Sequence, residues 1–226
     1  MRSSCGLICG TALAGMLAML AGTADGALPA RATFDVTLRA TVVKDWNTVT
    51  ESTEEGCTVV RRSIGRRTVT LRSARPTPVV VTLGSGKVTF SPAAIRFVVV
   101  RVTQTGENRT RREAPCRTGT ERQRCRPAKR MVSGGTFRFF RSARNEISFH
   151  SARLPTAGTS CPREPAAVRA ITPGLRDAEG EIAEADLAAA RSQTAFASAE
   201  LTTDLEGAVT GRVVERVSWS LTFLRG

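Results

Sequence analysis

Apolar and polar residues alternate in two stretches near opposite ends of the chain. The first covers residues 33–47 and is closed by Trp46, and the second covers residues 212–225 and contains the other tryptophan, Trp219. Because successive side chains of a β-strand point to opposite faces, both patterns predict half-buried strands. Their apolar positions are Phe34, Val36, Leu38, Ala40 and Val42, then Val217, Trp219, Leu221 and Phe223. We expect the first and last strands of the domain to close one core that holds both tryptophans.

Shorter alternating segments lie between these two stretches and are separated by residues that favour turns. Gly65 marks a turn between two such strands, and Gly84-Ser85-Gly86 predicts a tight hairpin. The segment 97–103 begins with four consecutive apolar residues and is expected to be the most buried strand, covered on both faces. Further strands are expected at residues 57–61, 68–72, 79–83, 87–90, 136–140, 146–150 and 193–203.

One helix is expected late in the chain. Thr172 suits the N-cap and Pro173 the first helical position, and residues 181–190 form the better-supported part. Many short strands with a single helix favour an all-β fold, either an antiparallel β-sandwich or an open barrel.

The N-terminus has the order of a secretory signal peptide. Arg2 precedes an apolar run at residues 7–21, and small residues follow around Ala24 and Gly26. The run is shorter than the about 20 residues that span a bilayer, so a membrane anchor is the weaker alternative. We therefore expect a signal peptide at 1–26 and a single β-rich, exported domain at 27–226 with no transmembrane segment.

Four cysteines follow the expected cleavage site, namely Cys57, Cys116, Cys125 and Cys161. An even number in an exported protein predicts two disulfides, for which three pairings are possible. We favour Cys116–Cys125, which closes a short loop, with Cys57–Cys161 as a long clasp. Metal ligation is the competing interpretation, but no Cys-x-x-Cys pair is present and His150 is the only histidine.

The chain is strongly basic, with a formal net charge of +13 that is carried almost entirely by arginine. Two explanations of this excess are open: GC-rich coding, which favours arginine codons, and an anionic partner that arginine binds. The charge is concentrated in residues 106–130, which have few apolar side chains and predict an exposed, disulfide-pinned loop or ribbon. The candidate anion-binding residues are Arg109, Arg111, Arg112, Arg117, Arg122, Arg124 and Arg126.

Catalytic and cofactor chemistry finds little support in the sequence. His150 ends a predicted strand, and no Gly-x-Ser-x-Gly elbow is present. The acidic cluster at 177–186 lacks the ligand pattern of a calcium loop, so no metal or other cofactor is expected. The chain has no tyrosine, and the arginine-rich segment has no aromatic platforms for specific nucleic-acid binding.

The leading hypothesis is therefore an exported, disulfide-bonded β-domain without enzymatic activity. It would act as a binding or structural protein at the cell envelope, with a basic surface for an anionic envelope polymer or lipid headgroups. The alternative is a secreted hydrolase, which would need two carboxylates to converge in a concave site. Candidate acids for that site are Asp45, Glu51, Glu54 and the acids at 177–186. A third possibility is a domain whose sheet is completed by a partner chain.

Overall fold

The computed structural model describes residues 31–84, 87–92, 94–113, 116–117, 119–124, 132–141, 146–151, 164–171, 180–181, 187 and 191–226. These residues form one antiparallel sheet and one short helix. The elements are β1 (Arg31–Glu54), β2 (Cys57–Ser73), β3 (Thr77–Gly84), β4 (Lys87–Ser91), β5 (Ala94–Arg112), β6 (Thr120–Arg124), β7 (Val132–Arg141), β8 (Glu146–Ser151), α1 (Ala166–Ala170), β9 (Gly180–Glu181), β10 (Ser192–Leu205) and β11 (Val209–Arg225). The expected predominance of antiparallel β-structure is confirmed.

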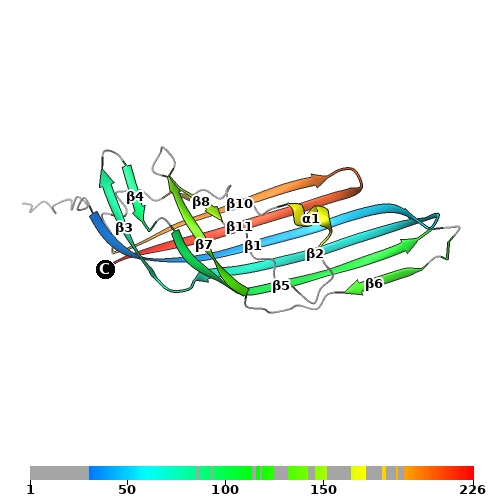
Figure 1. Cartoon of the computed structure of the whole chain (residues 1–226), viewed down its shortest axis with the longest axis horizontal. Coiled ribbons are helices and arrows are strands. Elements are labelled where there is room, and N and C mark those ends of the chain that lie inside the picture. The colour runs from blue at the N-terminus through cyan, green and yellow to red at the C-terminus, as the bar shows by residue number, and fades with distance from the viewer. Residues whose placement is uncertain are drawn as a thin grey trace, which may run out of the picture.

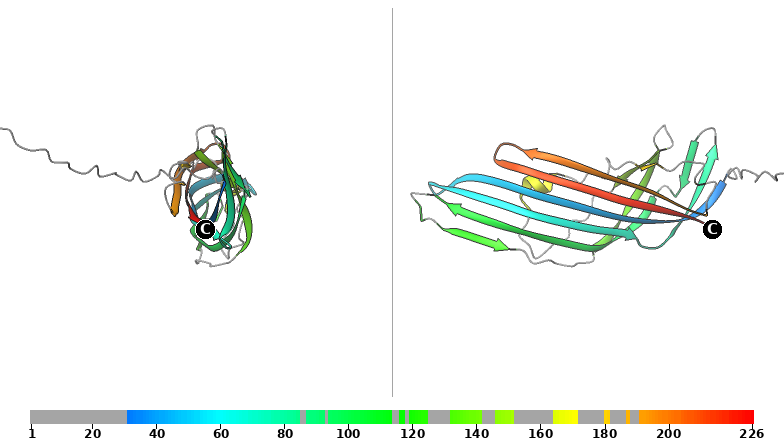
Figure 2. Two further views of the ribbon diagram at one scale, coloured as in Figure 1. Left: turned by 90° about the vertical axis from the view of Figure 1, so that its left-hand side faces the viewer. Right: turned by 180° about the vertical axis from the view of Figure 1, so that it is seen from behind.

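The long strands lie side by side in the order β10-β11-β1-β2-β5, and β7, β8 and β9 continue the sheet. The strands β3 and β4 extend it beside the beginning of β1, and β6 pairs with the end of β5. The molecule is elongated, with β3, β4 and the C-terminus at one end and β6 toward the other (Figure 1). Seen end-on, the sheet curls around its long axis (Figure 2).

The first and last strands, whose patterns match, are hydrogen-bonded neighbours. They pair without a break from Phe34 opposite Arg225 to Thr50 opposite Val209. The apolar positions of both strands share one face, which we call the inner face, and the intervening polar positions share the outer face. All nine predicted core side chains are buried: Phe34, Val36, Leu38, Ala40, Val42, Val217, Trp219, Leu221 and Phe223.

The two tryptophans nevertheless lie in separate clusters of buried residues. Trp219 belongs to the large cluster, whereas Trp46 packs with Val213 and Val168 in a small one. Trp219 lies opposite Ala40 in β1, six positions before Trp46, which corresponds to about 20 Å along the strand. The expectation of one core shared by both tryptophans is therefore wrong, because charged residues occupy the inner face between them.

Gly65 does not form the predicted turn. It lies inside the continuous strand β2, directly opposite Trp46 of β1. A Cβ atom on residue 65 would overlap the indole ring of Trp46. The same indole donates a hydrogen bond from Nε1 to Ser63 Oγ at 3.0 Å. The glycine makes room for a tryptophan of the neighbouring strand, so its role is one of packing.

The middle of β5 also differs from the prediction, because it is not covered on both faces. Val99 is buried, but Val100 is 36% exposed and Arg101 is exposed. The register with β2 shifts at this point, where Leu71 lies opposite Val99 but Thr70 lies opposite Arg101. The extra residue is a β-bulge, which a run of apolar residues does not reveal.

The predicted hairpin at Gly84 and the predicted late helix differ in how far the structure supports them. The hairpin at Gly84 is confirmed, since Gly84 lies opposite Lys87. The described helix α1 lies at Ala166–Ala170, before the segment in which a helix was expected. Within the better-supported part of that segment, residue 181 belongs to β9 and Leu187 is helical. Most of the expected helix, and the whole expected signal peptide, lie outside the described residues.

Candidate functional site

The predicted basic segment forms an antiparallel ribbon at one end of the sheet, made by the end of β5 and by β6 (Figure 1). Arg109 lies opposite Arg122, and Glu107 lies opposite Arg124. Glu107 forms ion pairs with Arg109 and with Arg122, whose Nε is 3.7 Å from Glu107 Oε1. The hydrogen bond from Arg109 and the charges of Arg109, Arg124 and Arg122 outweigh desolvation and lower the pKa of Glu107.

The other predicted anion-binding arginines are less compensated. Arg111 is 70% exposed and lies 3.9 Å from Glu113, at the limit of an ion pair. Arg112 and Arg117 are exposed and have no ion pair with any described residue. Arg126 lies outside the described residues. Residues 106–124 contain six arginines and three glutamates, so this ribbon carries an excess of three positive charges.

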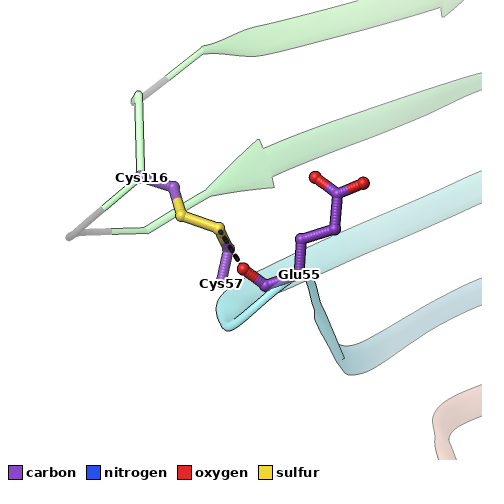
Figure 3. The surroundings of a disulfide bond; sticks show 3 residues. All are labelled: Glu55, Cys57 and Cys116. Atoms are coloured by element: carbon purple, nitrogen blue, oxygen red, sulfur yellow. Dashed lines mark hydrogen bonds between the residues drawn. A yellow bond between two sulfur atoms is a disulfide. The ribbon is translucent and has the colours of Figure 1, made fainter.

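A disulfide between Cys57 and Cys116 holds the turn of the ribbon against the first residues of β2 (Figure 3). The two Cα atoms are 5.8 Å apart, which is a normal disulfide separation. A backbone hydrogen bond from Glu113 N to Thr58 O, 2.9 Å long, supports the same junction. The favoured pairing of Cys116 with Cys125 and of Cys57 with Cys161 is therefore wrong. Strand pairing brings residue 57 beside the ribbon, whereas the prediction considered loop length alone.

Of the carboxylates proposed for a hydrolase, the three whose side chains the structure describes do not converge. Asp45 lies on the outer face, where Arg66 contacts both of its oxygens at 2.6 and 3.0 Å and Arg216 contacts one at 2.7 Å. Burial alone would raise the pKa of Asp45, but these two arginines lower it overall. Glu51 is exposed, and Glu54 pairs with Arg61 at 2.5 Å. The acids at 177–186 lie outside the residues whose side chains are described, as does the side chain of His150.

Sequence reasoning missed a buried ion-pair network on the inner face. Lys44 and Glu215 are each 2% exposed, and Lys44 Nζ lies 3.0 Å from Glu215 Oε1. Arg67 lies opposite Lys44 on β2, and its guanidinium is 2.9 Å from Glu164 Oε1. Burial raises the pKa of Glu215, although Lys44 opposes that shift. The signal in the sequence is that a lysine and a glutamate occupy apolar positions of two alternating patterns.

This network fastens α1 to the sheet. Besides Glu215, Lys44 Nζ donates hydrogen bonds to the carbonyl oxygens of Val168, at 3.0 Å, and Ile171, at 2.5 Å. Two of the three donors of this ammonium group therefore bond backbone carbonyls, while its charge pairs with Glu215. Glu164, just before the helix, is held by Arg67. The segment 164–171 is thus attached at both ends, and its carbonyls at the end of α1 are satisfied by a side chain of β1.

Three hollows on the outer face differ in charge. The first, of about 690 Å³, is lined by Asp45, Asp204, Arg62 and Arg212 among other residues. The second, of about 560 Å³, includes Asp45, Glu107, Arg66 and Arg124 in its lining. In both hollows carboxylates and guanidinium groups are equal in number. The third, of about 530 Å³, contains Arg39 and Arg72 and no carboxylate.

Comparisons of the chain with protein-family models, curated protein sequences and solved structures found no match. The described residues contain no group of three or more histidine, cysteine, aspartate or glutamate side chains that could hold a metal ion. Within the same part of the chain, no helix combines the length and the hydropathy that a membrane crossing requires.

Proposed function

We propose that the protein is an exported, disulfide-stabilised β-domain that binds an anionic partner at the cell envelope. The partner is an acidic envelope polymer or the headgroup surface of anionic lipids. The N-terminal pattern of Arg2 and the apolar run at 7–21 supports export, and so does a disulfide, which persists in oxidising compartments. In this proposal the protein acts by binding.

The observation that carries this proposal is the uncompensated charge of the ribbon. Arg111, Arg112 and Arg117 project from one end of an elongated molecule and have at most one distant carboxylate between them. Exposed guanidinium groups bind phosphate and carboxylate oxygens with two parallel hydrogen bonds. The disulfide limits the motion of the ribbon, so less conformational entropy is lost when a partner binds.

The sheet is proposed to be an open barrel instead of a two-sheet sandwich. Every described strand belongs to one hydrogen-bonded sheet, and the inner face holds the buried side chains. The two ends of the strand order approach each other, because β9 lies against β10. Such a curled sheet presents its outer face and the ribbon to a partner while its own core stays covered.

Co-sedimentation with vesicles tests the proposal. Mature protein is mixed with vesicles of phosphatidylglycerol and phosphatidylcholine, or with phosphatidylcholine alone. We expect binding only to the anionic vesicles, and a loss of most of it in the Arg111→Gln/Arg112→Gln variant. The matched control is Arg75→Gln/Arg191→Gln, which removes two exposed charges outside the ribbon. An acidic wall polymer replaces the vesicles in a parallel series. Equal binding by both variants, or no binding to either anionic material, would contradict the proposal.

A secreted hydrolase is the second candidate, now with different carboxylates. Glu164 and Glu215 are both buried, and burial, with a smaller contribution from the charge of Glu164, raises the pKa of Glu215 against the effect of Lys44. A raised carboxyl pKa is typical of a general acid. Hydrolysis of envelope polysaccharide that is abolished in Glu215→Gln, with the fold preserved by circular dichroism, would support it. Absence of hydrolysis by the wild-type protein would eliminate it.

A further inference from the structure

Arg39 of β1 and Arg72 of β2 lie directly opposite each other on the outer face. Both are exposed, and neither has an ion pair with a carboxylate of the described residues. Like charges at directly opposed positions destabilise a sheet unless an anion lies between them. Elsewhere on this face the arginines Arg66, Arg212 and Arg216 are each paired with a carboxylate. Arg62 and Arg101 on the same face also lack a described ion pair, but Arg39 and Arg72 are the pair that lines a hollow without a carboxylate.

Hydroxyl groups surround this arginine couple. The hollow that contains it is also lined by Thr41, Thr70, Ser218 and Ser220, all at outer-face positions of β1, β2 and β11. None of these hydroxyls has a side-chain hydrogen-bond partner among the described residues. A third exposed arginine, Arg101, lies opposite Thr70 and so borders the hollow. The three strands lie side by side in the sheet (Figure 1), which fixes the spacing of these donors.

We propose that this hollow binds a phosphate group. Two guanidinium groups, with a third at the border and four hydroxyls, offer more donors than the two oxygens of a carboxylate can accept. A phosphate has three or four oxygens arranged tetrahedrally, and arginine contacts such groups with paired hydrogen bonds. The absence of carboxylates from the lining removes the repulsion that the two other hollows would exert on an anion.

The phosphate group belongs either to a free phosphate compound or to a lipid headgroup. Phe196 distinguishes these sources because it is 76% exposed and lies opposite Ser220, which is itself opposite Arg39. Its position on β10 is two strand spacings, about 10 Å, from that of Arg39 on β1. Phe196 would contact the apolar part of a lipid and would not reach a free phosphate ion.

Isothermal titration with inorganic phosphate, and vesicle binding with phosphatidylglycerol, test the proposal in the mature protein. We expect saturable binding at one site, weakened at least about tenfold in Arg39→Gln/Arg72→Gln. The matched control, Arg62→Gln/Arg191→Gln, removes the same charge from exposed positions outside the hollow and retains full affinity. A free-phosphate source predicts that Phe196→Ser has no effect, whereas a lipid source predicts vesicle binding that falls in Phe196→Ser as well.

The proposal is overturned if the wild type binds neither inorganic phosphate nor phosphatidylglycerol vesicles, or if Arg39→Gln/Arg72→Gln binds both as the wild type does. The result is independent of the ribbon. The Arg111→Gln/Arg112→Gln variant tests the ribbon alone. If this variant loses vesicle binding but still binds inorganic phosphate, the ribbon and the hollow are two separate sites. Circular dichroism confirms that each variant is folded.

Discussion

Lys44 and Glu215 lie directly opposite each other on the inner face of β1 and β11, with 3.0 Å between Lys44 Nζ and Glu215 Oε1. The pair divides the buried surface into the large cluster around Trp219 and the small cluster around Trp46. Lysine is one of the rarest residues in this arginine-rich chain. At this position three acceptors converge on one point, which suits an ammonium group better than a planar guanidinium.

Replacing Lys44 with methionine should destabilise the fold strongly. The substitution leaves the carboxylate of Glu215 buried without its partner and leaves the carbonyls of Val168 and Ile171 without their donor. We expect the free energy of unfolding in urea to fall by about 3–5 kcal/mol. The double variant Lys44→Met/Glu215→Leu should recover much of this loss, because neither side chain then carries a buried charge. A double variant as unstable as the single one would contradict the assignment.

Glu215 should also make stability depend on pH. Burial raises its pKa above the ordinary value of 4.5, so the folded state binds this proton more tightly than the unfolded state does. Its contribution to stability is fully present below pH 4.5 and is lost as pH rises through the raised folded value. The variant Glu215→Gln should not show this loss of stability with rising pH. Asp45 and Glu107 have lowered pKa values, so their contributions to stability are instead lost as the pH falls. Urea titrations of both proteins from pH 3 to 8 measure the difference, and parallel curves would contradict it.

The disulfide should contribute substantially to stability. It joins residues 59 positions apart, and closure of a loop of that size corresponds to about 4 kcal/mol. The Cys57→Ser/Cys116→Ser variant should unfold at a correspondingly lower denaturant concentration. Non-reducing peptide mapping should recover the two cysteines in one linked pair, and a link from Cys57 to Cys161 would show that loop length was the better guide.

Gly65→Ala should be harmful although a strand normally tolerates alanine better than glycine. The added methyl group would overlap the indole ring of Trp46, so the ring must move away from its hydrogen bond with Ser63. We expect a loss of about 1–3 kcal/mol and a change in tryptophan fluorescence. Gly119→Ala is the control, because a Cβ atom there meets open space. Equal stability of both variants would show that Trp46 is not packed on residue 65.

Alternation along the chain predicted that the first and last stretches are half-buried strands of one β-domain, but it did not predict that β2 continues through Gly65. Each inner-face residue of β1 and β11 follows from a period of two. The inner positions of Lys44 and Glu215 follow from the same period, but nothing local shows that they meet or that α1 covers them. The role of Gly65 depends on Trp46 of another strand, and the partner of Cys57 depends on the pairing of β2 with β5. Each of these features depends on which strands are neighbours and in what register. Local patterns in a single sequence do not show strand order or register.

The excess charge of the ribbon is visible in the composition, but its local compensation is not. Glu107 is shared by Arg109 and Arg122, so these arginines are less available to a partner than Arg112 and Arg117. The sequence does not reveal the couple of Arg39 and Arg72, because the two residues are far apart along the chain. The register of β1 and β2 makes them neighbours.

The salt dependence of vesicle binding tests the account most directly. If exposed arginines of the ribbon bind the anionic surface, affinity for phosphatidylglycerol vesicles should fall steeply between 50 and 200 mM salt, roughly in line with counterion release. The slope of log affinity against log salt concentration should become shallower in Arg111→Gln/Arg112→Gln and stay unchanged in Arg75→Gln/Arg191→Gln. Binding that is independent of salt, or a slope that is the same in all three proteins, would contradict the account.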